Sequence, residues 1–272
     1  MSFFVTLFKS PIQILYTLFQ YRKLLYSTTK FELQKRYAGS LLGYAWLVLY
    51  PLLFLSVYLF LWLVIFKMRF PGYSELAYVV FVFSGLVPFL FVNESIGSVT
   101  TVIKQNIHLI KNVIIPIDLI PARVVGVVFP SFIIGSLLIT ILSAVNGTLS
   151  WGILLLPFVM ILLIAFILGI CLLLAPLGVF LPDLSNIVNL MMTLLMFLSP
   201  IAFKSDMVPS SLQLVILVNP ISYILEAFRY VFIGGHEVFI WQWLMFIIIS
   251  LATFCIGASF FQRFKGFVVD YE

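Results

Sequence analysis

The chain has 272 residues, of which 63% are hydrophobic and only 9% charged, and its formal net charge is +5. A soluble domain carries roughly 25% charged residues, so most of the surface must face lipid and the sequence predicts a polytopic membrane protein. The modest basic excess is typical of cytoplasmic loops, and nothing in the sequence supports nucleic-acid binding. Cys171 and Cys255 lie within apolar runs, which indicates small core residues and neither a disulfide nor a metal site.

The first 40 residues contain no run long enough to cross a bilayer. Ser10 followed by Pro11 favours a helix start, and the segment that follows mixes large apolar side chains with Lys and Arg. This combination predicts an amphipathic helix over residues 1–40 that lies on the membrane surface; a disordered basic tail is the alternative. The apolar run FFVTLF is too short for a signal-peptide core, so no cleavable signal is expected.

Six apolar runs each suit one crossing of about 20 residues. They cover residues 41–66, 77–102, 122–145, 151–180, 185–203 and 240–262. Residues 206–235 are also apolar, but proline, Asn-Pro and Gly-Gly interrupt them. Irregular backbone at membrane depth must be buried in protein or line a cavity. This segment therefore predicts two re-entrant outer helices, with one further crossing as the alternative.

The distribution of basic residues orients the spans. With six spans and both termini inside, eleven of the 15 Lys and Arg lie in inside segments and four in outside ones, as the positive-inside rule requires. A seventh crossing would weaken this bias by moving Arg263 and Lys265 outside. We expect an all-α protein with a transmembrane domain over residues 41–262, a cytoplasmic element at 104–121 and a cytoplasmic tail at 263–272.

The first span carries an aromatic residue at every fourth position. The series is Trp46, Tyr50, Phe54, Tyr58, Trp62 and Phe66. At 100° per residue the six rings wind through about 200° over roughly 30 Å of helix. One interpretation is a substrate-facing stripe, because aromatic rings stack on the C–H faces of sugars and the tyrosine hydroxyls can bind sugar hydroxyls. The other is an interfacial aromatic belt combined with ordinary helix packing.

Ionisable residues within spans are functional candidates because burying them in a membrane is costly. Glu94 on the second span can line a water-filled path or belong to a helix-packing cluster. Glu226 and Arg229 are three residues apart and can pair on one helix face, either as a structural ion pair or as part of a gate. The candidate outer gate comprises Pro209, Asn219, Pro220, Glu226 and Arg229.

The segment NIHLIKNVIIPIDLIPARVV at 106–125 is too polar to span a bilayer and too hydrophobic for a solvated loop. A loop on the inner leaflet is one interpretation, but the pattern favours a surface that binds another protein, stiffened by Pro116 and Pro121. The candidate coupling residues are Lys104, Ile107, His108, Leu109, Ile110, Lys111, Ile114 and Asp118.

No catalytic motif is present. The sequence lacks the phosphate loop G-x-x-x-x-G-K-[ST], the zinc motif H-E-x-x-H and a D-x-D acid pair. His108 has no second ligand nearby in the sequence, so no metal site is expected. We expect neither enzymatic activity nor a cofactor in this chain, and any Mg-ATP would bind to a separate ATPase.

Several segments, in order along the chain, carry a resemblance to a known family. They are KRYAGSLLGYAWLVLYPL at 35–52, FSGLVPFLF at 83–91, NIHLIKNVIIPIDLIPAR at 106–123, LPDLSNIVNLMMTLLMFLSPI at 181–201, VP at 208–209, NP at 219–220 and Glu226 with Arg229. This set resembles the ABC-type polysaccharide export permeases, the membrane subunits that export lipid-linked O-antigen, capsule or teichoic acid chains. The chain departs from the family pattern at Pro182, where an Arg often stands, and near Lys204, where a Tyr is usual.

The resemblance implies a homodimer of six-span subunits in the bacterial inner membrane, bound to two copies of a cytoplasmic ABC ATPase. It also implies that the 104–121 element meets the ATPase, that the re-entrant helices close the channel and that a lipid-linked glycan is the substrate. An ABC exporter of a drug or a lipid is the nearest alternative. An ion-driven carrier is a further one, although Glu94 alone gives it little support.

Overall fold

The computed structural model of the protein describes residues 2–65, 67, 74–107 and 115–271, and helices supply all the regular secondary structure of these residues. The α-helices are α1 (Ser2–Gln20), α2 (Arg22–Tyr37), α3 (Trp46–Leu59), α4 (Glu75–Gln105), α6 (Leu119–Val145), α7 (Leu156–Phe180), α8 (Leu184–Leu198), α9 (Gln213–Val218), α10 (Pro220–Phe232) and α11 (Ile240–Tyr271). Short turns η1 (Gly43–Ala45) and η3 (Trp151–Leu155) precede α3 and α7, and a π-helical turn, η2 (Phe60–Ile65), continues α3. Two further turns, η4 (Ser205–Met207) and η5 (Ser210–Leu212), precede α9.

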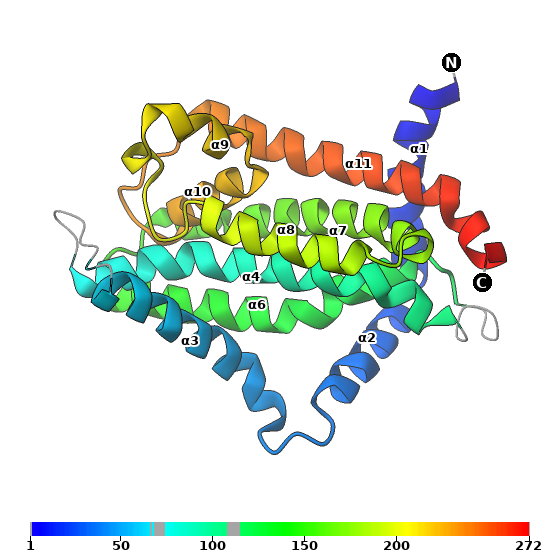
Figure 1. Ribbon diagram of the computed structural model, residues 1–272, viewed down its shortest axis with the longest axis horizontal. Coiled ribbons are helices and arrows are strands. Elements are labelled where there is room, and N and C mark those ends of the chain that lie inside the picture. Colours follow the sequence, from blue (N-terminus) through cyan, green and yellow to red (C-terminus); the bar gives the residue numbers. More distant parts are fainter. Residues whose placement is uncertain (1, 66, 68–73, 108–114, 272) are drawn as a thin grey trace.

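The long helices α4, α6, α7, α8 and α11 lie alongside one another as a bundle (Figure 1). Both termini, the end of α4 and the start of α6 lie at one end of this bundle, and α9 and α10 lie at the other. The helices α2 and α3 diverge from the bundle and meet in a V, whose tip contains Gly39 and Gly43. Both glycines have positive φ, +79° and +49°, a conformation that side chains other than glycine rarely adopt.

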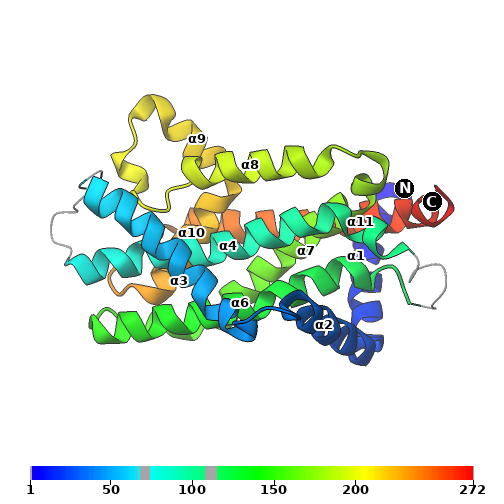
Figure 2. The same ribbon diagram turned by 60° about the horizontal axis from the view of Figure 1, so that its bottom comes forward.

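The core is built around α4, which is apolar and buried on all sides over residues 80–92. It lies between α8 and α6 (Figure 2) and also packs on α7 and α10. Aromatic rings form part of this packing. Phe91 of α4 stacks on Phe132 of α6, with ring centroids 4.7 Å apart, and Phe132 contacts Phe228 of α10 edge to face. A short helix at the far end of the bundle is thereby fixed against two long ones.

Glycines allow α7 and α11 to cross at very close range. A Cβ atom at Gly169 of α7 would lie 2.5 Å from the backbone nitrogen of Phe254, and one at Gly257 of α11 would overlap the carbonyl of Gly169. Gly178 in the same way allows α7 to approach Thr100 of α4. Small residues at helix contacts are typical of membrane bundles, because packing there relies on close van der Waals contact.

Four of the described helical segments are long and apolar enough to cross a membrane. They are Glu75–Gln105, Leu119–Val145, Trp151–Phe180 and Ile240–Phe267. The pair Ser210–Val218 and Pro220–Phe232 bends by 86° at Asn219 and is either a broken span or a re-entrant loop. Gly43–Leu59 and Leu184–Leu198 are shorter apolar helices. The prediction of an all-helical membrane protein is confirmed, and each of the six predicted apolar runs overlaps a helix.

The N-terminal region differs from the single helix that the sequence predicts over residues 1–40. It forms two helices, α1 and α2, that change direction at Tyr21. The first begins at Ser2, upstream of the predicted start at Ser10, and contains Pro11. A proline removes one backbone hydrogen bond and disfavours a helix interior, yet α1 runs through Pro11 from Ser2 to Gln20. Ile14 is fully buried in α1, which packs across α11.

Candidate functional site

The face that α3 presents to the bundle is a narrow stripe. Its buried residues are Leu47, Pro51, Leu55 and Tyr58, which recur every three to four positions. Such a spacing keeps them on one side of a helix, and they pack toward α4 and α6. The opposite side of α3 is exposed and apolar, as Leu53, Val57 and Phe60 illustrate.

The predicted aromatic series rotates from the exposed face of α3 into the core. Trp46 and Tyr50 are 36% and 46% exposed, Phe54 is half-buried, and Tyr58 is only 7% exposed. The rotation follows from the 40° that each four-residue step adds on an α-helix. The substrate-facing stripe stays a prediction: among its described members, Tyr58 is buried whereas Trp46 and Tyr50 are exposed. The side chains of Trp62 and Phe66 lie outside the described residues.

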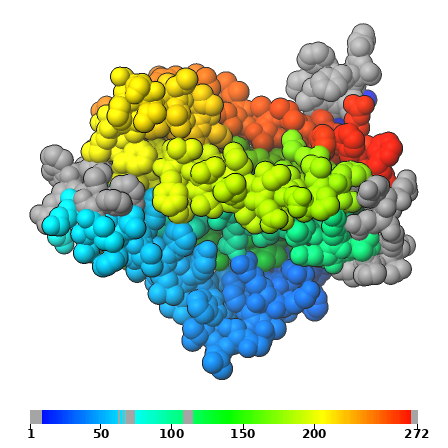
Figure 3. Space-filling view, in the orientation of Figure 1, coloured from blue at the N-terminus to red at the C-terminus, as the bar shows by residue number. Residues whose placement is uncertain are grey.

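Tyr50, Phe54 and Tyr58 nevertheless share one feature, a groove between α3 and α8. The groove has a volume of about 400 Å³ and is completed by Met196 and Phe197 of α8. Its lining is almost entirely apolar, and the rings of Tyr50 and Phe54 lie 6.2 Å apart along it. Figure 3 shows α8 and α3 as neighbouring surfaces on one face of the molecule. The exposed apolar side chains of α8, among them Leu190 and Leu194, extend this face.

Glu94 of α4 does not stand alone. Its carboxylate forms an ion pair with Arg36 of α2, and the Glu94 side chain is 20% exposed. Glu94 also borders a small cavity, of about 20 Å³, that Tyr50 closes on the α3 side. Glu94 thus joins α2 to the middle of α4, close to Tyr50, which also lines the groove. The sequence contains no local signal for this pair, because its members lie on different helices.

Beside this ion pair, a polar cleft of about 340 Å³ opens between α2, α4 and α6. Arg123, the buried cation of α6, lines it and donates a hydrogen bond of 2.7 Å to the amide oxygen of Asn106. The end of α4 is thereby joined directly to α6, across the element that connects the two helices.

Asp118 anchors the other end of the same element. It is buried, and its carboxylate accepts hydrogen bonds from Gln262, at 2.7 Å, and from Lys265, at 3.2 Å to each oxygen. Both partners belong to the last turns of α11. The start of α6 is therefore tied to the C-terminal part of α11, a contact that sequence reasoning missed because the partners are 147 residues apart.

The remaining predicted coupling residues divide into two groups. Lys104 and Ile107 lie at the end of α4 and are partly exposed. The others lie outside the described residues: His108, Leu109, Ile110, Lys111 and Ile114.

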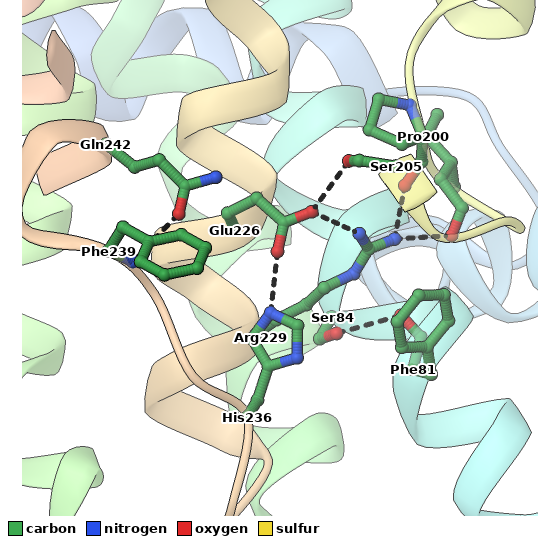
Figure 4. Close-up of polar contacts among 10 residues, drawn as sticks. Phe81, Ser84, Pro200, Ser205, Glu226, Arg229, His236, Phe239 and Gln242 are labelled. Atoms are coloured by element: carbon green, nitrogen blue, oxygen red, sulfur yellow. Dashed lines mark hydrogen bonds and ion pairs between the residues drawn. The ribbon is translucent and has the colours of Figure 1, made fainter. Parts of the chain in front are cut away.

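A buried ionic cluster, which we call the outer cluster, joins α10 to the segment after α8 (Figure 4). It comprises Ser205, Glu226, Arg229 and His236. Arg229 is fully buried and donates to Glu226 at 3.1 Å, as the spacing of the two residues indicates. It also donates to the carbonyl oxygens of Ile201, at 2.9 Å, and of Pro200. Its guanidinium group lies 3.8 Å from the centre of the Phe81 ring on α4, a favourable cation–π geometry.

The carboxylate of Glu226 makes three contacts, two of them in addition to Arg229. One oxygen accepts hydrogen bonds from Arg229 and from the Ser205 hydroxyl, at 3.3 Å, and the other lies 2.6 Å from the His236 ring nitrogen. A buried carboxylate needs such compensation because its desolvation is costly. His236 and Ser205 were not expected from the sequence, since a lone histidine and a loop serine carry no pattern that points to Glu226.

Asn219 and Pro220 form the bend between α9 and α10. The Asn219 side chain accepts a hydrogen bond from the Ile221 backbone and donates one to Ser199. It therefore caps α10 and fixes it to the end of α8, while Pro220 occupies the first helical position, where its missing N–H costs nothing. Pro209 is exposed and precedes η5.

The described residues include no group of three or more His, Cys, Asp or Glu that could hold a metal ion. The polar groups that the fold brings together join helices to one another. Helices of this length and hydropathy require a bilayer as their environment, so the fold is that of a multi-pass membrane protein.

Comparison with known proteins assigns the family. The chain belongs to the ABC-2 type transporter family, whose sequence model matches residues 23–233. It is 29% identical over 224 residues to the O-antigen export system permease protein RfbA of Myxococcus xanthus, covering 81% of this chain and 84% of the relative. It is also 28% identical over 259 residues to the protein of the same name from Klebsiella pneumoniae, covering 93% of this chain and 96% of the relative.

Proposed function

We propose that this protein is the membrane subunit of an ATP-driven exporter that moves a lipid-linked polysaccharide, such as an O-antigen, across the bacterial inner membrane. The observation that carries the proposal is the similarity, over most of the chain, to permeases named for O-antigen export. The groove between α3 and α8 supports it, because aromatic rings on an apolar wall suit both a lipid chain and the C–H faces of sugars. Membership of the ABC-2 family implies a separate ATPase subunit.

The proposed topology has six spans: α3, α4, α6, α7, α8 and α11. Gly43–Leu59 is short as an α-helix, but η1, α3 and η2 run without a break from Gly43 to Ile65, and such a length reaches roughly 30 Å. The bent pair α9–α10 is then a re-entrant element, in which α10 is buried in protein, as backbone at membrane depth beside a break must be. The positive-inside rule puts both termini and the α4–α6 connection in the cytoplasm.

The helices α1 and α2 form the proposed interfacial region. Exposed apolar side chains follow one face of α1 at positions 12, 15, 16 and 19, a spacing that aligns them along a helix. A helix with such a face lies in the plane of the membrane surface with that face in the lipid. The Arg36–Glu94 ion pair then carries any displacement of α2 directly to α4.

A second copy of the chain is the proposed partner of the α3–α8 face. Its exposed apolar residues extend well beyond the groove, over both helices. Closure of two such faces on each other would enclose the two grooves between the subunits, and separation of α3 and α8 would open a path for a glycan. The apolar rings in that path offer contact area without fixed hydrogen-bond partners, which suits a polymer that must slide.

In the proposed mechanism the ATPase binds to the 104–121 element, and its movement during ATP hydrolysis is transmitted to the membrane helices through this element. Both ends of this element are anchored: Asn106 to Arg123, and Asp118 to Lys265 and Gln262. A push on the element therefore reaches α6 and α11 together. At the opposite end, the outer cluster holds α10 in the closed position, and its rearrangement would accompany opening.

A deletion strain tests the export role. If the protein exports a lipid-linked glycan, its loss leads to a polyprenyl- or lipid-linked polymer accumulating inside the cell, detected by lipid extraction and mass spectrometry. Purification of the tagged protein should also recover an ABC ATPase. An unchanged polymer pool, or transport that survives ATP depletion but stops with an uncoupler, would contradict the proposal and favour a different substrate or an ion-driven carrier.

A further inference from the structure

A cavity of about 230 Å³ lies next to the outer cluster, between η4, α9, α10 and the start of α11. Glu226 forms part of its wall, and Gln242, drawn in Figure 4, forms another part. The cavity is separate from the α3–α8 groove, with which it shares no lining residue. Neither the family match nor the names of the relatives assigns it a role.

Two aromatic rings form one wall of this cavity. Trp241 and Tyr223 meet edge to face, with centroids 5.9 Å apart and an angle of 82° between the rings. Tyr223 is held in place because its hydroxyl donates a hydrogen bond of 2.6 Å to the Leu217 carbonyl. Trp241 is 43% exposed, so a large part of its indole is available to a ligand.

The polar part of the lining contains groups whose hydrogen bonds are not used up. Ser222 is only 4% exposed, and its hydroxyl has no hydrogen-bond partner among the described residues. A buried hydroxyl without a partner is destabilising, and a ligand hydroxyl that bonded to it would offset this cost. Gln242 accepts a hydrogen bond from the Phe239 backbone through its oxygen; within the described chain, no acceptor meets its NH₂ group.

The charge of the cavity restricts what it can bind. Its lining includes the carboxylates of Asp206 and Glu226 and no Lys or Arg. An anionic lipid head group or a phosphate is therefore disfavoured by repulsion. Asp206 and Gln213 lie exposed at the rim, where a carboxylate and an amide can accept hydrogen bonds from a neutral ligand rich in hydroxyl groups.

We propose that this cavity binds a single sugar residue of the exported glycan. A pyranose presents an apolar C–H face, which fits the rings of Trp241 and Tyr223, and hydroxyls that both donate and accept, which fit Asp206 and Ser222. The volume lies below the roughly 300–1,000 Å³ of sites for drug-sized ligands, in keeping with one residue at a time. The inference rests on the proposed export function, and it adds a glycan-binding site at the outer end of the bundle.

Binding of methyl glycosides to the purified full-length protein in detergent tests this site. The probes are methyl glycosides of neutral hexoses, a deoxyhexose and N-acetylhexosamines, observed by saturation-transfer NMR. At least one should bind, and Trp241→Ala should weaken that binding by about tenfold, the size of one lost aromatic contact. Trp241→Phe should retain most of the affinity. Trp151→Ala, at a tryptophan that is 87% exposed and lies outside the cavity, is the matched control and should bind as the wild type does.

Two further measurements make the outcome unambiguous. Thermal unfolding of each variant shows whether it is folded, and Asp206→Ala, at the exposed rim, provides a second loss of binding if Trp241→Ala does not fold. Absence of binding by every glycoside, or binding unaffected by both variants, overturns the inference. If polymer accumulates in the deletion strain but no glycoside binds, only the proposed binding site is refuted. If no polymer accumulates, the proposed export function itself is refuted.

Discussion

Replacing Arg229 with methionine removes the cation from the outer cluster while keeping a long apolar side chain. Arg229 is fully buried and donates hydrogen bonds to Glu226 and to the carbonyls of Ile201 and Pro200. The variant would leave Glu226 buried without its arginine and both carbonyl oxygens without their donor. The segment after α8 would lose its main attachment to α10.

The size of the effect follows from these contacts. Removing one partner of a buried ion pair costs about 3–5 kcal/mol, and each carbonyl left without a donor adds about 1 kcal/mol or more. His236 and Ser205 still contact Glu226 and compensate part of its charge. We therefore expect the free energy of unfolding to fall by about 4 kcal/mol. For a chain of this length, this corresponds to a decrease in Tm of about 10 °C.

Thermal unfolding of the purified protein in detergent, followed by tryptophan fluorescence, measures this decrease. The control is the double variant Glu226→Met with Arg229→Met. Replacing both partners of a buried pair with apolar residues is often nearly neutral, so the double variant should be more stable than Arg229→Met alone. A Tm of Arg229→Met within about 2 °C of the wild type, or a double variant no more stable than the single one, would refute the reasoning.

Three other predictions concern the groove, the coupling element and the helix crossing. Tyr50→Leu should reduce glycan export, measured as surface polymer, without lowering Tm, whereas Tyr58→Leu should lower Tm because Tyr58 is buried; equal effects on Tm would contradict the assignment of their faces. Asp118→Asn should lower export per ATP hydrolysed in the reconstituted complex, because it weakens the tie to α11; unchanged coupling would exclude this role. Gly257→Ala should destabilise the protein by about 3 kcal/mol or more through overlap with α7, while Gly266→Ala, in open space, should have little effect on Tm; similar behaviour of the two would refute the close crossing.

Much of the fold could be predicted from hydropathy. Within a bilayer every backbone polar group must be satisfied inside the chain, so a long apolar run must be helical. For that reason each of the six predicted apolar runs overlaps a helix, and the interruptions at Asn219 and Pro220 mark the sharp bend between α9 and α10. The i, i+3 spacing likewise indicated the pairing of Glu226 with Arg229, since local geometry alone brings them together.

The N-terminal region shows where this reasoning fails. Composition predicts an amphipathic character but not the division into α1 and α2, because the change of direction at Tyr21 follows from the packing of α1 on α11 and of α2 on α6. The aromatic series illustrates a related limit. Its winding could be calculated from helix geometry, but which ring faces the core depends on where α4 and α6 lie.

The sequence by itself determined that this is an all-helical membrane protein and where most of its helices run, because the bilayer acts on each segment separately. Only the tertiary structure decided the partners of its charged residues: Arg36 for Glu94, Lys265 for Asp118 and His236 for Glu226. A charge buried among helices needs an opposite charge or a donor nearby. Which residue supplies it depends on how distant segments pack, and no local pattern in the sequence records that.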